Sequence, residues 1–205
     1  MSKLRIGVLA STRGTDMQAL IDAIDEGRLD AEISVVISNK MDAPCLERAQ
    51  KAGLEAVFID PKGKERCDYD EEVMECLTSH GVELVVMVGY MRILSDNFIE
   101  SYRNRIMNVH PSLLPAFGGG MDKDVHREVL DYGCKVTGCT IHFADETPDG
   151  GPIIAQECIR IEESDTVETL KEKVQAAEMR QYVRAVDLYS RGKLKVEGRC
   201  VRVLD

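Results

Sequence analysis

Short apolar runs rich in β-branched residues alternate with amphipathic stretches through the first half of the chain. Strands are expected over residues 4–10, 33–38, 56–59 and 84–88, and a further strand is expected to end at Asn108. Helices are expected over residues 16–26 and 43–52, and a third is expected to begin near Asp68. Repeated β-α-β units form parallel sheets with right-handed crossovers. The alternation therefore predicts an α/β fold with a doubly wound, mostly parallel sheet of Rossmann-type topology.

The second half of the chain follows a different pattern. A glycine-rich loop at residues 118–120 precedes a helix near residues 124–132 and two strands over 136–143 and 153–161. A long helix over roughly residues 166–190 and a short terminal hairpin complete the pattern. With 205 residues and no internal repeat or linker, the chain is expected to form a single domain.

The composition argues against several classes of function. The formal charge of -10, without a long basic run, is unfavourable for a nucleic-acid surface, so a small substrate is expected. No window approaches eighteen uninterrupted apolar residues, and the first residues lack a signal-peptide core. We therefore expect a cytoplasmic protein that does not bind membranes. The seven cysteines include no C-x-x-C pair and are expected to be reduced core residues.

The stretch M-N-V-H-P-S-L-L-P, residues 107–115, carries the strongest functional signal. Asn108 and His110 are two residues apart, so an extended strand places both side chains on one face. Pro111 biases His110 towards extended backbone and cannot donate to a sheet ladder, so the strand should stop here. Open α/β sheets bind ligands at the carboxyl ends of their strands. An amide and an imidazole are therefore expected to face a cleft.

The first loop, S-T-R-G-T-D at residues 11–16, joins a buried strand to a helix and has two interpretations. Free amides at the helix N-terminus, with hydroxyls and a glycine, suit a phosphate. Alternatively, Thr15 or Asp16 simply caps the helix. The loop matches neither G-x-G-x-x-G nor a P-loop, which disfavours a dinucleotide or a nucleoside triphosphate.

Other candidate residues also have a structural alternative. Arg66 could reach a phosphate or lie solvated in its loop, and the run Met91, Arg92, Ile93 and Leu94 could line a pocket or pack a hinge. Asp149 lies in a T-P-D-G-G-P turn, where an aspartate usually only stabilises the turn. It becomes a candidate site residue only if it pairs with His110 and favours the protonated imidazole.

The remaining histidines suggest structural roles. His142 is expected to be a buried structural or supporting residue, His80 a helix-end cation and His126 an exposed helix position. Asp122, Asp124 and His126 alternate, but a solvated loop and a first helical turn explain them. With no closely spaced ligand pair among the histidines, no metal is expected.

Across nearly its whole length the chain resembles the phosphoribosylglycinamide formyltransferase family, which is folate-dependent and belongs to purine biosynthesis. The matching pieces are the S-T-R-G-T-D loop, S-N-K at residues 38–40, G-Y-M-R-I-L at 89–94, N-V-H-P-S-L-L-P at 108–115 and D-G-G-P at 149–152. The N-x-H-P-S-L-L-P run with a downstream D-x-G-P is highly specific to folate-dependent formyltransferase-like domains.

The resemblance implies a role for each matching residue. The catalytic trio would be Asn108, His110 and Asp149. The glycinamide ribotide would contact Gly14, Thr15, Asp16, Arg66, Asn108 and Glu178, and the folate would contact Met91, Arg92, Ile93, Leu94 and Asp145. Residues 1–105 would form the phosphate-binding half, and residues 106–205 the folate-binding and catalytic half. The co-substrate would be 10-formyltetrahydrofolate, without a metal. The chain departs from many relatives at Asp16, where an asparagine is common, at the F-G-G-G run and at Met179.

Formyl transfer passes through a tetrahedral carbon that bears an oxyanion, and Asn108 and a protonated His110 are suitable donors to that oxygen. A formyltetrahydrofolate deformylase would use the same trio on water, but normally carries an extra regulatory domain. A methionyl-tRNA formyltransferase would need an RNA-binding domain and a basic face. A non-catalytic phospho-sugar or folate-binding module would not require the intact trio. The sequence leaves monomer and homodimer open.

Overall fold

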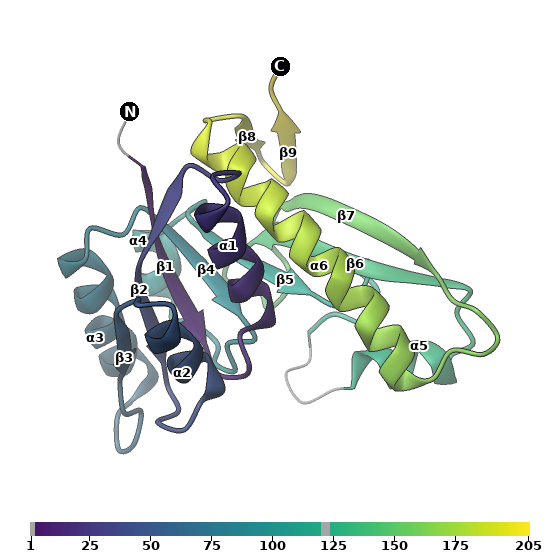
Figure 1. The fold of residues 1–205 in the computed structure, drawn as a ribbon, viewed down its shortest axis with the longest axis horizontal. Coiled ribbons are helices and arrows are strands. Elements are labelled where there is room, and N and C mark those ends of the chain that lie inside the picture. The colour runs from purple at the N-terminus through teal and green to yellow at the C-terminus, as the bar shows by residue number, and fades with distance from the viewer. Residues whose placement is uncertain (1–2, 120–123) are drawn as a thin grey trace. The chain divides into compact units, whose positions relative to one another are not determined.

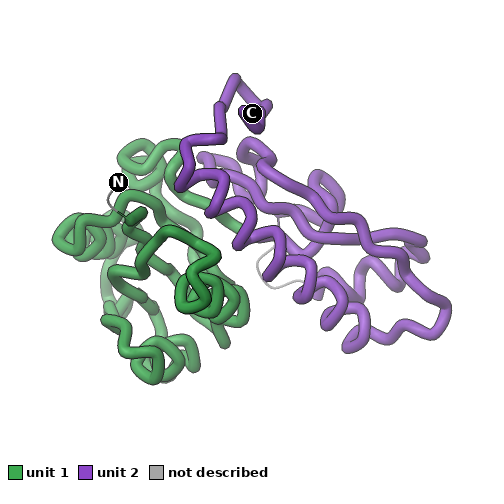
Figure 2. The backbone as a smooth tube through the Cα atoms, turned by 45° about the horizontal axis from the view of Figure 1, so that its top comes forward, with its two compact units in different colours: residues 1–108 green, residues 109–205 purple. Residues whose placement is uncertain are grey.

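The computed structural model describes residues 3–119 and 124–205, so Gly120 and Asp122 lie outside the described residues. The chain divides into two compact units, residues 1–108 and residues 109–205 (Figure 2). The boundary falls within strand β5 (Ile106–His110).

The first unit alternates strands and helices along its length. Its elements are β1 (Leu4–Ala10), α1 (Thr15–Asp25), β2 (Ala31–Ser38), α2 (Pro44–Lys51), β3 (Ala56–Phe58), α3 (Arg66–Ser79), β4 (Leu84–Val88), α4 (Asp96–Ser101) and the start of β5. The strand order is β3-β2-β1-β4-β5, and every pair is parallel. Helices α1 and α2 cover one face, and α3 and α4 cover the other (Figure 1). The predicted α/β class with a doubly wound, mostly parallel sheet is confirmed.

Strands β1 and β4 explain where a ligand can enter this unit. Both are almost continuously apolar and buried, because helices cover both faces of the sheet. The chain leaves β1 for β2 on one side, whereas β4 joins β1 on the other side. The strand order therefore reverses between β1 and β4, and such a switch point leaves a crevice at the carboxyl ends of its strands. The loops that follow β1 and β4 lie at this edge.

Two local expectations about the first unit and its last strand were wrong, and one helix was not predicted. Strand β5 continues through His110 instead of ending at Asn108, because only Pro111 stops the ladder. Helix α1 begins at Thr15 after a left-handed Gly14, so neither Thr15 nor Asp16 is the N-cap. Helix α4 was not predicted, because six residues are too few to show a helical period; its cap is Ser95, which accepts the N–H of Phe98.

The second unit contains α5 (Val125–Asp131), β6 (Val136–Phe143), β7 (Ile153–Arg160), α6 (Val167–Ser190), β8 (Leu194–Glu197) and β9 (Cys200–Val203). Strands β6 and β7 form an antiparallel hairpin, β7 pairs with β9 in parallel, and β8 and β9 form the predicted terminal hairpin. The long helix α6 lies along β6 and β7 (Figure 1). It starts with a capping box in which Thr166 and Thr169 bond reciprocally.

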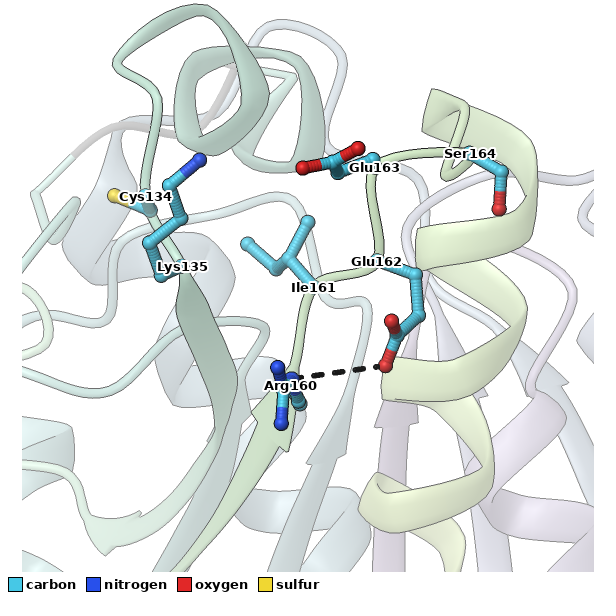
Figure 3. Close-up of a pocket in the computed structure, with 7 residues that line it drawn as sticks. All are labelled: Cys134, Lys135, Arg160, Ile161, Glu162, Glu163 and Ser164. Carbon is cyan, nitrogen blue, oxygen red and sulfur yellow. Dashed lines mark ion pairs between the residues drawn. The ribbon is translucent and has the colours of Figure 1, made fainter.

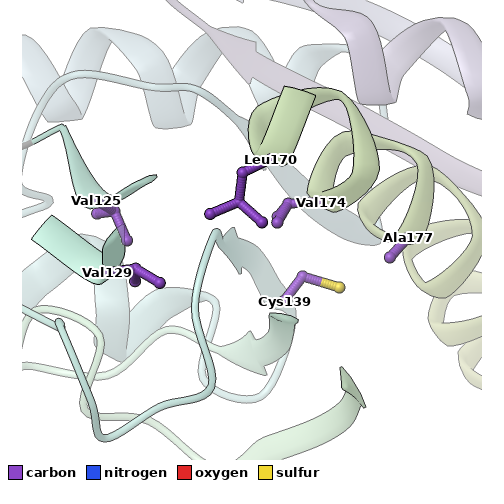
Figure 4. Close-up of a cluster of buried hydrophobic side chains, with 6 residues drawn as sticks. All are labelled: Val125, Val129, Cys139, Leu170, Val174 and Ala177. Carbon is purple, nitrogen blue, oxygen red and sulfur yellow. The ribbon is translucent and has the colours of Figure 1, made fainter. Parts of the chain in front are cut away.

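A compact apolar cluster joins α5, β6 and α6 within this unit (Figure 4). Its members are Val125, Val129, Cys139, Leu170, Val174 and Ala177. Leu170, Val174 and Ala177 are fully buried and follow one another at helical spacing on α6. Burying a side chain such as Leu170 contributes about 1.5 to 3 kcal/mol. The cluster therefore holds the long helix against the hairpin.

Two expectations about burial were wrong in part. His126 was expected to be exposed, but only 8% of it is, because it shares the packed face of α5 with Val129. The cysteines are free, but only Cys45 and Cys139 are buried, whereas Cys67, Cys158 and Cys200 are exposed. Cys158 is exposed because β7 alternates, and its side chain shares the outer face with Gln156 and Arg160. Among the described helices, none is both long and apolar enough to span a membrane.

Candidate active site

His110 and Asp149 meet at the end of β5 in the second unit. The Nδ1 atom of His110 lies 3.3 Å from Oδ2 of Asp149, and the exposed fractions of the two side chains are 7% and 16%. The same carboxylate oxygen accepts the backbone N–H of Gly119 at 2.9 Å. The pairing that the sequence could only suggest is therefore present in the fold.

The other nitrogen of the His110 ring also faces an acceptor. Nε2 lies 2.9 Å from the carbonyl oxygen of Phe117, and a carbonyl can only accept. The two ring nitrogens of His110 therefore both face hydrogen-bond acceptors, a carboxylate at Nδ1 and a carbonyl at Nε2.

The turn that carries Asp149 has an unusual backbone conformation. The N–H of Gly150 donates to the carbonyl of Thr147 at 2.8 Å, and Asp149 itself has φ of 55°, which aspartate tolerates better than most residues. Burial would raise the pKa of Asp149, but hydrogen bonds from His110 and from the Gly119 N–H outweigh it and lower the pKa below its ordinary value. Asp149 is therefore a carboxylate at neutral pH.

His142 lies beside this pair on β6. It is 1% exposed, and its Nδ1 donates to the carbonyl of Phe143 at 2.9 Å. Its Nε2 stands 3.7 Å from Oδ1 of Asp149, which is beyond hydrogen-bond range. Burial lowers the pKa of His142, so the ring is neutral near pH 7. His142 therefore lies beside the Asp149 carboxylate as a neutral ring.

Side chains that sequence reasoning missed hold the loop after β5. Thr140 on β6 donates to the carbonyl of Ser112 at 2.7 Å and accepts the N–H of Leu114 at 3.0 Å. Gln156 on β7 donates to the carbonyl of Leu114 at 3.1 Å and to Thr140 at 2.9 Å. The S-L-L run is therefore tied to the β6–β7 hairpin. The only signal in the sequence for this role was the polar residue Thr140 between two apolar residues, Cys139 and Ile141.

Two further sequence candidates lie elsewhere in the second unit. Asp145 follows β6 and accepts the N–H of Thr147 at 2.9 Å, so it shapes the turn that carries Asp149. Glu178 lies on α6 and is 7% exposed. Asn108 belongs to the first unit by its position in the chain and precedes His110 by two residues on β5.

In the first unit, the loop after β1 opens onto the N-terminus of α1. Gly14 has φ of 67°, and a Cβ there would lie 3.1 Å from Cβ of Cys45, so glycine suits both the conformation and the space. No side chain at Gly14 caps the helix. Asp16 is 7% exposed, its Oδ1 has no hydrogen-bond partner among the described residues, and burial raises its pKa to about 6.

The segment of Met91, Arg92, Ile93 and Leu94 follows β4 and lies beside that loop. The hydroxyl of Ser11 accepts the N–H of Met91 at 2.8 Å, and the N–H of Ser11 donates to the carbonyl of Gly89 at 3.2 Å. Arg66, the first residue of α3, is exposed and lies near Asp70. The fold therefore brings Gly14, Thr15 and Asp16 to the same strand edge as the segment 91–94.

Residues 4–186 match the family model described as formyl transferase. The chain belongs to the formyl transferase family. A solved member, glycinamide ribonucleotide transformylase 1 from Symbiobacterium toebii, is 44% identical with a TM-score of 0.95, and the match covers 100% of this chain and 95% of that chain. The phosphoribosylglycinamide formyltransferase of Bacillus subtilis is 36% identical over 87% of this chain and 90% of its own length.

Other relatives of this formyl transferase are longer or more distant. The trifunctional purine biosynthetic protein adenosine-3 of Gallus gallus is 41% identical over 95% of this chain, but the chain spans only 19% of that protein. A formyltetrahydrofolate deformylase from Pseudomonas syringae shares the fold with a TM-score of 0.91 at 25% identity, and the match covers 99% of this chain and 66% of the deformylase. The chain is therefore more similar in sequence to the transformylase from Symbiobacterium toebii than to this deformylase.

This formyl transferase also has a cavity of about 560 Å³ that none of the predicted site residues lines (Figure 3). It is lined by Cys134, Lys135, Arg160, Ile161, Glu162, Glu163 and Ser164. Two of the lining residues, Arg160 and Glu162, form an ion pair at 3.8 Å, so their charges are paired with each other. Among residues 3–119 and 124–205, no group of three or more His, Cys, Asp or Glu side chains is placed to hold a metal ion.

Proposed function

We propose that this protein transfers a formyl group from 10-formyltetrahydrofolate to the amino group of glycinamide ribonucleotide, in the de novo synthesis of purines. The contact of His110 with Asp149, 3.3 Å apart at the end of β5, is the observation that carries the proposal. It supplies an imidazole donor whose orientation is fixed by a carboxylate, and an oxyanion is stabilised by donors that are already in place.

In the proposed reaction, the substrate amine attacks the formyl carbon and forms a new C–N bond. The carbonyl electrons move to oxygen, and the resulting oxyanion accepts hydrogen bonds from the Asn108 amide and from His110. The intermediate then collapses, the bond to N10 of the folate breaks, and the proton lost by the amine passes to N10. An amine with a pKa near 8 is about a tenth neutral at pH 7, so stabilisation of the oxyanion matters more than a strong base.

The Phe117 carbonyl bears on this step. The Phe117 oxygen lies 2.9 Å from Nε2 of His110. If Nε2 donates to the oxyanion, it must exchange the Phe117 carbonyl for the substrate oxygen. Asp149 keeps its contact with Nδ1 during this exchange, so the ring retains its orientation.

We assign the remaining site residues by the same proposal. Gly14, Thr15 and Asp16 bind the phosphate through amides at the N-terminus of α1, where no side chain at Gly14 competes. Arg66 and Glu178 make further contacts to the ribotide, and Met91, Arg92, Ile93, Leu94 and Asp145 bind the folate. We further propose that the protein acts in the cytoplasm and without a metal. The proposal is compatible with a homodimer.

A folate-release assay tests this function against its two alternatives. The protein is incubated with 10-formyltetrahydrofolate, with and without glycinamide ribonucleotide, and tetrahydrofolate and the formylated ribotide are quantified. Transfer predicts that both products appear in equal amounts and only when the ribotide is present. Release without the ribotide would identify a deformylase, and binding without release would identify a non-catalytic module.

A further inference from the structure

Asp70 is a buried carboxylate on α3 to which no function has yet been given. Its residue is 0% exposed, and its Oδ2 accepts the backbone N–H of Ser95 at 2.5 Å. Ser95 directly follows Leu94 and caps α4. The carboxylate therefore holds the C-terminal end of the segment 91–94.

The same segment is held at its other end by Ser11, whose hydroxyl accepts the N–H of Met91 at 2.8 Å. Residues 91–94 belong to neither a strand nor a helix, so no ladder or helical bonds define their path. Two side-chain acceptors, at Met91 and at Ser95, flank them. Of the two, Asp70 is fully buried, so water does not compete for its bond to Ser95.

The surroundings of Asp70 act on its pKa in opposite directions. Burial raises the pKa of Asp70 above its ordinary value, and the hydrogen bonds from Ser95 and the nearby Arg92 and Arg66 offset part of that rise. The guanidinium of Arg92 lies 4.2 Å from the ring centroid of Tyr69, and the hydroxyl of Tyr90 donates to that of Tyr69 at 3.4 Å. Helix α3 therefore orients Arg92 through Tyr69 and fixes Ser95 through Asp70.

The cluster also has unused hydrogen-bonding capacity. Oδ1 of Asp70 and Nε of Arg92 are both buried without a hydrogen-bond partner among the described residues. A buried acceptor and a buried donor without partners are unfavourable unless another constraint maintains them. The backbone of the segment supplies that constraint, since moving Asp70 towards Arg92 would release Ser95.

We propose that Asp70 is a positioning residue for the folate: by holding Ser95, it sets the path of residues 91–94 and thereby the affinity for 10-formyltetrahydrofolate. This inference rests on the proposed function, in which that segment binds the folate. Asp70 is fully buried, so it acts on the folate through the segment and not by direct contact. Its loss should weaken folate binding and leave ribotide binding and the chemical step nearly intact.

The test compares Asp70→Ala, Asp70→Asn and the control Leu77→Ala by steady-state kinetics. Removing the acceptor in Asp70→Ala should raise KM for 10-formyltetrahydrofolate about tenfold or more, and Asp70→Asn, which keeps a neutral acceptor, about threefold. In both variants kcat and KM for the ribotide should stay within about twofold. Leu77 lies on the same helix, is 0% exposed and points at Gly7 on β1, so Leu77→Ala lowers stability without touching Ser95.

Hydrogen exchange of the Ser95 amide, followed by NMR, provides a readout independent of turnover. The account expects faster exchange of this amide in both Asp70 variants and no local change in Leu77→Ala. An unchanged folate KM in Asp70→Asn, or an equal rise in Leu77→Ala, would overturn the proposal even if Asp70→Ala fails to fold. Absence of ribotide-dependent transfer in the wild-type protein would instead refute the proposed function.

Discussion

Asp149 touches His110 and the backbone of Gly119 with a single carboxylate oxygen, at 3.3 Å from Nδ1 and 2.9 Å from the amide nitrogen. One residue therefore orients the imidazole and anchors the loop whose Phe117 carbonyl faces the other ring nitrogen. The pair is nearly buried, so solvent screens the interaction weakly. The geometry makes Asp149 a structural and an electrostatic partner of His110.

Substitution of the trio should affect the chemical step far more than binding. Asn108→Ala, His110→Ala and Asp149→Asn should each lower kcat by about 100 to 1000-fold, the usual effect of losing an oxyanion donor or its support. KM for either substrate should change only a few-fold. Steady-state kinetics check this, with Asp131→Asn at the exposed end of α5 as a control that should behave as wild type. Near-normal turnover in all three variants would show that these residues do not have the catalytic roles assigned to them.

The glycine at position 151 should be indispensable for the turn that presents Asp149. A Cβ at Gly151 would lie 1.8 Å from the Phe143 carbonyl oxygen, so Gly151→Ala must push the turn away from β6. We expect the free energy of unfolding to fall by about 1 to 3 kcal/mol, as for other overpacked sites. Since Asp149 moves with the turn, kcat should fall at least about tenfold.

Gly133 provides the matched control for that variant. It has φ of 78°, but a Cβ there meets nothing within 4 Å. Gly133→Ala should therefore lose about 1 to 2 kcal/mol through backbone strain and keep its kcat. Denaturant unfolding measures the loss of stability in both variants, and steady-state kinetics measure kcat. Together they distinguish the effect of backbone strain from the effect of moving Asp149. Equal activity of the two would show that the turn tolerates the added methyl group.

Asp16 should make the protein less stable as the pH rises. Burial raises its pKa from 3.8 to about 6, so between these values the folded state holds a proton that the unfolded state has lost. Stability is therefore greatest below pH 4 for this group and falls until about pH 6, by about 3 kcal/mol at roughly 1.4 kcal/mol per pKa unit. Asp16→Asn, which stays neutral, should remove this dependence and be more stable at pH 7.5.

Chemical denaturation between pH 4 and pH 7.5 measures that effect. Asp22→Asn, on the exposed side of the same helix, is the control and should keep the wild-type pH profile. A wild-type profile that Asp16→Asn leaves unchanged would mean that Asp16 is ionised at no cost in the folded protein.

The cysteines should differ in reactivity according to their burial. Cys67, Cys158 and Cys200 are exposed and should react with iodoacetamide in the native protein. Cys45 and Cys139 are buried, and burial also raises the pKa of the Cys45 thiol, so both should react only after unfolding. Mass spectrometry of the labelled peptides gives the order. Native labelling of Cys45 at the rate of Cys67 would contradict the packing of α2.

Periodicity was sufficient to predict most elements of the fold from the sequence. Strands β1, β4 and β6 have the expected bounds, because an apolar run between turn residues marks a buried strand at both ends. Helix α4 lacked such a signal, and the left-handed Gly14 took the capping position expected for Thr15 or Asp16. His126 was misjudged because the face that α5 buries is decided by α6, which lies far along the chain.

The site was predictable in its residue types but not in its geometry. The sequence suggested that Asp149 could approach His110, yet only the fold sets their distance, since the turn and the strand end are remote in the chain. Thr140 and Asp70 show the limit more clearly. Each is a polar residue whose partner, Leu114 or Ser95, is a backbone amide, and such partners leave no pattern in the sequence.

The central claim is that His110 and Asp149 act as one unit in ribotide-dependent formyl transfer. The most direct test is kcat of the wild type, His110→Ala, Asp149→Asn and the double variant in the same assay. Groups that act as a unit are strongly non-additive, so the double variant should be about as slow as the slower single variant. If the two losses multiply in the double variant, the residues act independently and the account of this site is wrong.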